Sequence, residues 1–255
     1  MPTPVLVAPE HLLLGNRFAP ITSEMGFIAA PRDQVVHAYL AWQTPLQAER
    51  KIKFDVTQVA GSCSSVLKRL VPLTQAEASK SLFLPLENGW TAYVDNLAGG
   101  TDAESIVLCV SQRLSCLGIK MLAAPNTMSS ERSDAAGAYG GLTLHVYDPK
   151  QADDDLGYNR VIALINDAGR WVFVSEGSPL PFEDIQSYDR KVKTDRFSFS
   201  KLKTYLNAFG LSAFDERFYR TLDPGAILIE ARGRDIDALE SISLQEARRL
   251  LGIEG

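Results

Sequence analysis

Two kinds of hydrophobic spacing alternate along the whole 255-residue chain, and this alternation most constrains its fold. Residues 51–59 and 141–148 place apolar side chains at every second position, which is typical of half-buried β-strands. Residues 31–40 and 198–210 place them three and four positions apart, which is typical of helices with one buried face. Because no charged or Gly/Ser-rich linker separates these segments, the sequence predicts strands and helices that pack together.

The expected fold is α+β, or mixed α/β: one compact domain over residues 1–255, with helices packed on a mixed sheet. The order strand, helix, strand, helix recurs on both sides of residue 85, which suggests two similar halves and a subdivision near that residue. Asn88-Gly89 separates two apolar runs and predicts a β-hairpin. The pattern predicts further strands at residues 25–30, 118–125 and 226–231 and a final helix at residues 243–252.

Residues 153–169 are predicted to form another helix. Three consecutive aspartates at its start suit the positive end of the helix dipole, and Gly169 suits the position just after a helix. Between them, the spacing i, i+3, i+4, i+7 is met by Tyr158, Val161, Ile162 and Ile165.

Residues 90–114 read as a strand, a glycine pair and a helix, a corner at which nucleotide-binding proteins place phosphates. The stretch lacks the lysine of GxxxxGK[ST] and the spacing of GxGxxG. Thr101 and Glu104 instead have the spacing of a capping box, which favours a capped turn without a ligand. The alternative that stays open is a small-molecule pocket or an enzyme site around Asp95, Gly99, Gly100 and Thr101.

The sequence carries no motif of a known catalytic chemistry. GxSxG is absent, and Cys63 in GSCS has no evident activating base beside it. The three cysteines form no CxxC pair and only three histidines accompany them, so no metal and no cofactor is expected. The Asp153–Asp155 run lacks the alternating ligands of a calcium loop. We therefore predict a protein that is not an enzyme.

Charge is unevenly distributed. Residues 81–184 carry a net −8, whereas residues 1–80 carry +2 and residues 185–255 carry +1, within a total of −5. Binding to nucleic acid requires Lys and Arg against the phosphates, so the acidic middle argues against it. The acidic middle is compatible with a basic partner and equally with a solvated surface that keeps the protein soluble. With no run of 18 apolar residues and no basic, uninterrupted leader, we expect a cytoplasmic protein without a membrane span.

The segments GWTAYVDN, NDAGRWVF and PLPFED look like those of a family of largely uncharacterised bacterial proteins. The compact α+β pattern, the acidic middle and the missing catalytic motifs also resemble bacterial immunity proteins that neutralise type VI secreted nuclease toxins. This resemblance implies a non-catalytic inhibitor, monomeric when free, that binds and blocks a cognate toxin, of which a nuclease is one candidate.

Such an inhibitor presents an acidic surface where the phosphates of the toxin's nucleic-acid substrate would lie. The residues expected to bind the partner are the carboxylates of the acidic middle and one neighbouring aromatic ring. They are Asp95, Asp102, Asp153, Asp154, Asp155, Tyr158, Glu183 and Asp184.

Overall fold

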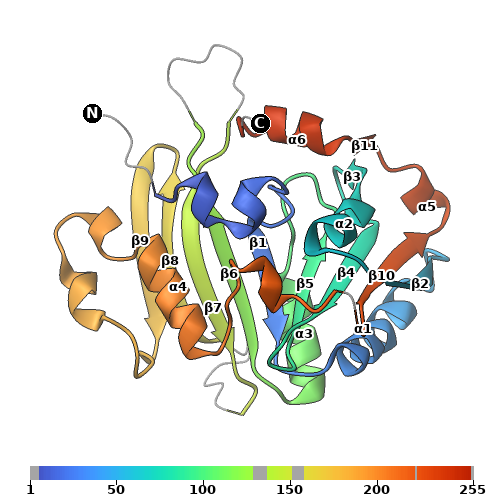
Figure 1. Ribbon diagram of the computed structural model, residues 1–255, viewed down its shortest axis with the longest axis horizontal. Helices are drawn as coiled ribbons and strands as arrows, with labels where there is room; N and C mark the ends of the chain where they lie inside the picture. Colours follow the sequence, from blue (N-terminus) through green and yellow to red (C-terminus); the bar gives the residue numbers. More distant parts are fainter. Residues whose placement is uncertain (1–5, 129–136, 151–157, 222, 254–255) are drawn as a thin grey trace.

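The computed structural model describes residues 6–128, 137–150, 158–221 and 223–253, which form an α+β fold with helices on both faces of a nine-stranded sheet (Figure 1). The strands are β1 (Glu24–Ile28), β2 (Lys53–Val59), β3 (Leu73–Thr74), β4 (Lys80–Pro85), β5 (Thr91–Asp95), β6 (Gly118–Ala124), β7 (Gly141–Tyr147), β8 (Tyr158–Asp167), β9 (Arg170–Gly177), β10 (Ala226–Arg232) and β11 (Ser241–Ile242). The helices are α1 (Arg32–Leu46), α2 (Cys63–Leu67), α3 (Glu104–Leu114), α4 (Phe199–Ala208), α5 (Arg234–Asp237) and α6 (Leu244–Leu250). Short 3-10 turns lie at Pro9–His11, Leu13–Asn16, Lys68–Leu70, Ile185–Asp189, Lys193–Asp195 and Glu216–Phe218.

The large sheet has the strand order β2-β10-β4-β5-β1-β6-β7-β8-β9, and every neighbouring pair in it is antiparallel. The α+β prediction is confirmed, but the expectation of a mixed sheet is wrong. The reason is that β4–β5 and β6–β7–β8–β9 follow one another along the chain as neighbours, so they need no crossover helix. The sheet continues across residue 85, where β4 and β5 pair.

Two hydrophobic cores lie on opposite faces of this sheet. Neighbouring residues of one strand point to opposite sides, so Phe83 of β4 faces α1 and α3, whereas Leu82 faces the other core. Tyr39 of α1 and Val107 of α3 belong to the first core, and Leu202 of α4 belongs to the second. Figure 1 shows α4 lying across β7 and β8, while α1 and α3 cover the other face.

Helix α3 approaches the sheet closely because glycines stand beneath it. A Cβ atom on Gly26 of β1 would lie 2.5 Å from Val107 Cγ2, and one on Gly118 of β6 would lie 2.2 Å from Ser111 Oγ. Both distances are far below van der Waals contact, so these two positions exclude larger residues. The close fit sets how near α3 lies to β1 and β6.

The predicted β-hairpin at Asn88-Gly89 is confirmed. Asn88-Gly89 turns the chain between β4 and β5, with Gly89 at a φ of 83°. The side chains of Ser62, Ser198 and Ser243 cap α2, α4 and α6 by accepting a backbone N–H three residues further on.

The predicted helix at residues 153–169 is wrong. Residues 158–167 form β8, which pairs with β7 on one side and β9 on the other; residues 153–157 lie outside the described part of the chain. Ile162 and Leu164 face one core while Ala163 on the opposite face is also buried, so the strand reads as an apolar run without alternation. Gly169, at a φ of 88°, turns the β8–β9 hairpin instead of ending a helix.

Among the described residues, no helix combines the length and the hydropathy that crossing a membrane requires.

Candidate ligand-binding cleft

A cleft of about 410 Å³ lies between the C-terminal half of α1, the start of α3 and the β2–β10–β4–β5 end of the sheet. This volume is within the range of pockets that hold small organic ligands. Asp95, at the end of β5, lines the cleft, and so does Asp102, just before α3. Gly99, Gly100 and Thr101 do not line it, so the predicted glycine corner lies beside the cleft and forms no part of its wall.

Four buried side chains form a continuous chain of hydrogen bonds in the wall of the cleft. Tyr39 comes from α1, Ser81 from β4, and Tyr93 and Asp95 from β5. The Tyr39 hydroxyl lies 3.3 Å from Ser81 Oγ, which lies 3.3 Å from the Tyr93 hydroxyl. Tyr93 donates to Asp95 Oδ2 at 3.2 Å. Because Ser81 pairs directly with Asp95 across the two strands, the register of the sheet sets this order.

The donor-to-acceptor direction along this row of hydrogen bonds follows from the number of protons that each hydroxyl carries. Each hydroxyl has one proton and two lone pairs. Tyr93 uses its proton at Asp95, so it must accept from Ser81, and Ser81 must accept from Tyr39. With Asp95 ionised, all three O–H groups therefore point toward the carboxylate. The Tyr39 oxygen, at the far end, keeps a lone pair with which to accept a further hydrogen bond.

The carboxyl group of Asp95 is 1% exposed and accepts from three donors. Besides Tyr93, the amide of Leu97 donates to Oδ1 at 3.0 Å and the amide of Asp102 donates to Oδ2 at 3.1 Å. Burial nevertheless raises the pKa of Asp95 to about 6, because the hydrogen bonds only partly offset the cost of desolvating the charge. The negative charge of Asp102 adds to this rise in pKa.

Two carboxylates from the sheet hold the start of α3. Asp95 Oδ2 accepts from the Asp102 amide, and Glu24 Oε1 of β1 accepts from the Ala103 amide at 3.0 Å. The helix N-terminus attracts negative charge, and here the charge comes from Asp95, at the end of the preceding strand, and from Glu24, 79 residues before Ala103.

The capping box predicted at Thr101 and Glu104 is therefore wrong. Thr101 Oγ1 donates to the Ile21 carbonyl at 2.9 Å and accepts from the Asp95 amide at 3.1 Å. Glu104 accepts from Lys120 and Tyr158 instead of reaching back to residue 101. The side chains that occupy the helix start come from β5 and β1, which the local spacing could not reveal.

Aromatic rings form the apolar wall of the cleft. The ring of Tyr39 is centred 6.3 Å from Trp42 of the same helix and 6.4 Å from Phe54 of β2, both at edge-on angles. Trp42 and Phe54 are half-buried, so part of each ring is open to a ligand. Arg113 of α3 lies over the Trp42 ring, 5.7 Å from its centroid, and is not itself part of the lining.

The charged groups that line the cleft are all acidic. They are Glu77, Asp95 and Asp102, and none of the described lining residues is Lys, Arg or His. Glu77 is neutralised from outside by Arg50, whose two terminal nitrogens each lie 2.8 Å from a carboxylate oxygen. Asp102 is exposed at the start of α3. The cleft is therefore suited to neutral or cationic groups and unsuited to anions.

A second polar cluster lies on the other side of the α3 N-terminus. Lys120 Nζ of β6 lies 2.9 Å from Glu104 and 3.4 Å from Glu24, and Tyr158 of β8 donates to Glu104. Burial lowers the pKa of Lys120, but the two carboxylates outweigh it and the pKa is raised. Burial, helped by the charge of Lys120, lowers the pKa of His145 to about 4, so its ring is neutral at pH 7.

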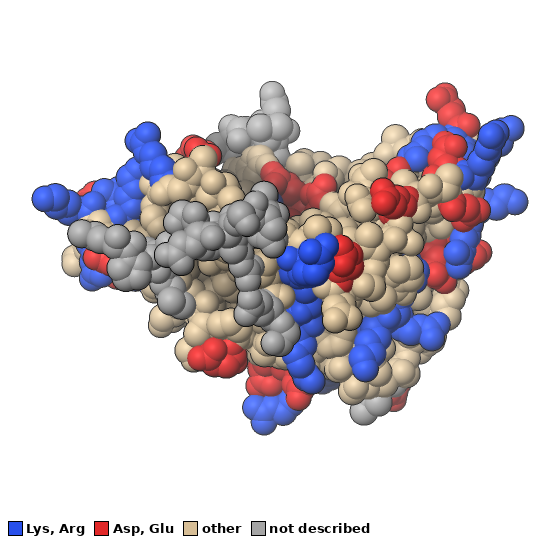
Figure 2. Space-filling model, turned by 90° about the horizontal axis from the view of Figure 1, so that it is seen from above, with Lys and Arg blue, Asp and Glu red and all other residues tan. Residues whose placement is uncertain are grey.

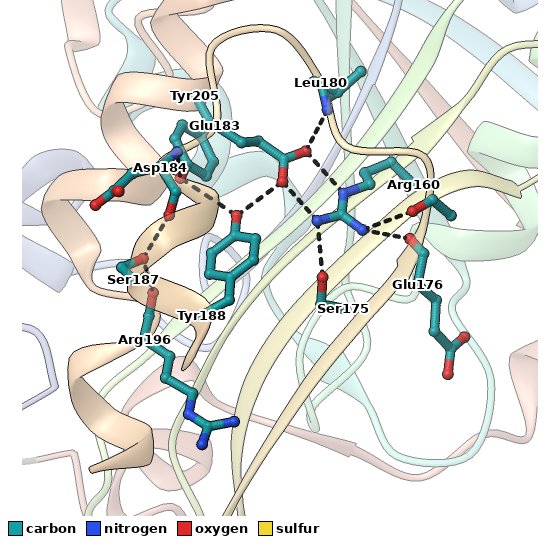
Figure 3. Close-up of polar contacts among 11 residues, drawn as sticks. Arg160, Ser175, Glu176, Leu180, Glu183, Asp184, Ser187, Tyr188, Arg196 and Tyr205 are labelled. Carbon is teal, nitrogen blue, oxygen red and sulfur yellow. Dashed lines mark hydrogen bonds and ion pairs between the residues drawn. The ribbon is translucent and has the colours of Figure 1, made fainter. Parts of the chain in front are cut away.

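A third polar cluster is a closed network around Arg160 (Figure 3). Its guanidinium forms a bidentate ion pair with Glu183, at 2.8 and 2.6 Å, and donates its other protons to Ser175 Oγ and to the carbonyls of Glu176 and Gly177. Glu183 also accepts from the Leu180 amide. Every donor of the guanidinium is used, which indicates a structural clamp on the segment after β9.

Those residues predicted to bind a partner that the structure describes do not all lie on one surface. Asp95 and Asp102 meet at the cleft, and Tyr158 bonds Glu104, the first residue of α3. The Glu183 side chain is 0% exposed, and exposed Asp184 pairs with Lys201 at 3.1 Å. In the sheet, β1, β6 and β7 separate the β5 end from β8. Asp153, Asp154 and Asp155 lie outside the described residues.

The surface charge that can be seen is mixed. Figure 2 shows Lys and Arg side chains interspersed with Asp and Glu on the face it presents, without one continuous acidic field. The exposed carboxylates of residues 81–184 are also spread over several elements. Within the described residues they are Glu87 at the β4–β5 hairpin, Asp102 before α3, Asp167 at the β8–β9 turn, Glu176 near the end of β9 and Asp184 beyond β9.

Sequence reasoning missed three of the four residues of the hydroxyl chain. Tyr39 stood in the predicted apolar stripe of a helix, and Ser81 and Tyr93 stood in predicted strands, so each had a structural explanation. A signal did exist: the sequence predicted the β4–β5 hairpin, and its register places Ser81 opposite Asp95. The contribution of α1 could not be read from any spacing along the chain.

No protein-family model matches the chain, and neither a curated protein nor a solved structure matches it. What the cleft does must therefore be argued from its own residues.

Proposed function

We propose that the protein binds a small organic molecule in the cleft between α1 and α3. The observation that carries the proposal is the hydrogen-bonded chain from Tyr39 to Asp95, which ends in a cleft with aromatic walls. Burying hydroxyls and a carboxyl group is costly where apolar side chains would fill the same space. Ligand sites combine an apolar lining with a few convergent polar groups, and this cleft has that composition.

A fragment screen tests the proposal. Two-dimensional NMR and thermal shift would be measured with a panel of small amines, alcohols and acids on shared scaffolds. Binding raises the apparent melting temperature, and fragments in the cleft shift the signals of residues such as Trp42 and Ser105.

A matched pair of variants controls the screen. Ser105 is exposed on α3 and lines the cleft, so Ser105→Trp fills the site; Gln112 is exposed on the same helix outside it, so Gln112→Trp leaves the site open. We expect hits that Ser105→Trp removes and Gln112→Trp retains. A panel without any hit sensitive to Ser105→Trp would reject the cleft as a ligand site.

We also propose, from the sequence resemblance and the acidic middle of the chain, a second candidate function as an inhibitor of a bacterial toxin. What supports it in the structure is limited to exposed carboxylates such as Asp102, Asp167 and Glu176. Co-purification with the product of a neighbouring gene, in a complex that weakens as salt increases, is the expected result. A gene neighbourhood that is entirely metabolic counts against this candidate.

A further inference from the structure

The cleft presents hydrogen-bond acceptors to whatever it binds. With Asp95 ionised, the protons of Tyr93, Ser81 and Tyr39 are all used along the chain. What remains of it for a ligand is the lone pair of the Tyr39 oxygen. Beyond this chain, the carboxylate of Asp102 is a second acceptor, while Trp42, Gln43 and Ser105 of the lining carry N–H or O–H groups that can donate. A ligand that complements the end of the cleft at Tyr39 and Asp102 therefore donates hydrogen bonds.

Two carboxylates of the cleft, Asp95 and Asp102, also have no cation paired with them among the described residues. Asp102 lies close enough to Asp95 and Glu24 that its charge raises the pKa of both. Lys120 forms an ion pair with Glu24 at 3.4 Å. Within the described parts of the chain, no Lys or Arg forms an ion pair with Asp95 or Asp102. A positive charge in the cleft would relieve this repulsion.

The aromatic wall provides an independent reason for the same preference. The faces of Tyr and Trp rings attract cations, and the attraction is strongest where water is excluded. Trp42 already holds the guanidinium of Arg113 at 5.7 Å, while the lining of the cleft itself contributes rings from Tyr39, Trp42 and Phe54. Rings, acceptors and carboxylates face the same space.

We infer that the ligand of the cleft is an organic cation, with an ammonium group near Asp102 and Tyr39 and an apolar or aromatic body against Trp42 and Phe54. This inference rests on the proposed ligand-binding function and specifies its chemical class. A phosphate or carboxylate ligand would meet the carboxyl groups of Asp95 and Asp102, which have no cation paired with them among the described residues, and no Lys, Arg or His among the described lining residues.

Matched trios of compounds test the charge preference. Each scaffold (indole, phenyl, cyclohexyl or linear alkyl) carries an ethyl arm that ends in an ammonium, a hydroxyl or a carboxylate; tryptamine, tryptophol and indole-3-propionate form the indole trio. Affinities are measured by calorimetry at pH 7.5. We expect the amine of a trio to bind about tenfold more tightly than its alcohol, and the carboxylate to bind most weakly.

Two variants separate charge from shape. Asp102→Asn should reduce the ratio of amine to alcohol affinity to near one while it leaves the alcohol's affinity unchanged, because it removes charge and keeps volume. Trp42→Leu should weaken amine and alcohol together. Asp167→Asn, at the β8–β9 turn beyond the opposite half of the sheet, is the control and should change neither value.

Failure of the inference can be told from failure of the proposed function. If alcohols or carboxylates bind in the cleft as tightly as their amines, with binding lost in Ser105→Trp, the cleft is a ligand site and the cation preference is wrong. If no member of any trio binds in a way that Ser105→Trp abolishes, both the ligand site and its charge preference are rejected.

Discussion

Arg160 and Glu183 form a bidentate ion pair in which both side chains are withdrawn from solvent, 1% and 0% exposed. The pair joins β8 to the segment that follows β9, and the hydroxyl of Tyr188 and the amide of Leu180 complete the shell around the carboxylate. Removing one partner of such a pair leaves the other charge buried, which costs more than the intact pair contributes.

Glu183→Gln should therefore lower the free energy of unfolding by about 3–5 kcal/mol, the range for breaking a buried ion pair. The neighbouring carboxylate provides the control, because Asp184 is exposed and its ion pair with Lys201 is open to water. Asp184→Asn should change stability little. Urea denaturation of both variants measures the difference, and equal midpoints would contradict the clamp.

Gly26→Ala should lower the free energy of unfolding by about 1–3 kcal/mol, the usual cost of overpacking. The new methyl group would lie 2.5 Å from Val107, so α3 must move away from β1. Gly99→Ala is the control, since a Cβ there meets nothing within 4 Å. Thermal unfolding of the two variants provides the test. A Gly26→Ala protein as stable as Gly99→Ala would show that α3 is not held tightly.

Asp95 should make the protein less stable as pH rises from about 4 to about 6. Its pKa is raised to about 6 by burial, so between these values the folded protein binds more protons than the unfolded chain. The contribution of Asp95 to the free energy of unfolding is fully present below the pKa that Asp95 has in the unfolded chain, and it is lost as pH rises through 6. Its upper bound is about 3 kcal/mol. Comparing the urea midpoint against pH in the natural protein and in Asp95→Ser measures it, and parallel profiles would contradict the assignment.

His145 should have the opposite effect on the pH dependence of stability over nearly the same pH range: it should make the protein less stable as pH falls. Burial lowers its pKa to about 4, so the unfolded chain binds the extra proton below pH 6.5 and the folded protein resists it until pH 4. Its contribution is present above pH 6.5 and is lost as pH falls. His145→Gln should therefore flatten the acid side of the profile. An imidazole NMR titration measures the pKa directly, and a value near 6.5 would refute the prediction.

The sequence predicted most elements but misread one strand for a physical reason. Residues 158–167 satisfy a helical spacing because β8 carries apolar residues on both faces, including Ile165, which is 37% exposed, and a strand that is apolar on both faces has no period of two. Edge strand β2 shows the reverse case. Its alternation was read correctly as a strand, although Val56, expected on the buried side, is 49% exposed.

The candidate site was less accessible to sequence reasoning than the fold. Asp95 and Asp102 were singled out for their charge, but what joins them is a hydrogen bond from a backbone amide. Tyr39 reaches the site from a helix more than 40 residues before Ser81. Contacts of this kind depend on how α1 packs on the sheet. No local pattern in a single sequence predicts that packing.

The hydrogen-bonded chain has a consequence for the polarity of the cleft. A carboxylate accepts, but a carboxylic acid can also donate, and a row of hydroxyls between it and the cleft can run in either sense. When Asp95 takes up a proton, Tyr93, Ser81 and Tyr39 can all reverse. The hydroxyl of Tyr39 then changes from acceptor to donor toward the cleft. Protonation of Asp95 on β5 thereby reverses the direction of an O–H group on α1, although no proton moves between the two residues.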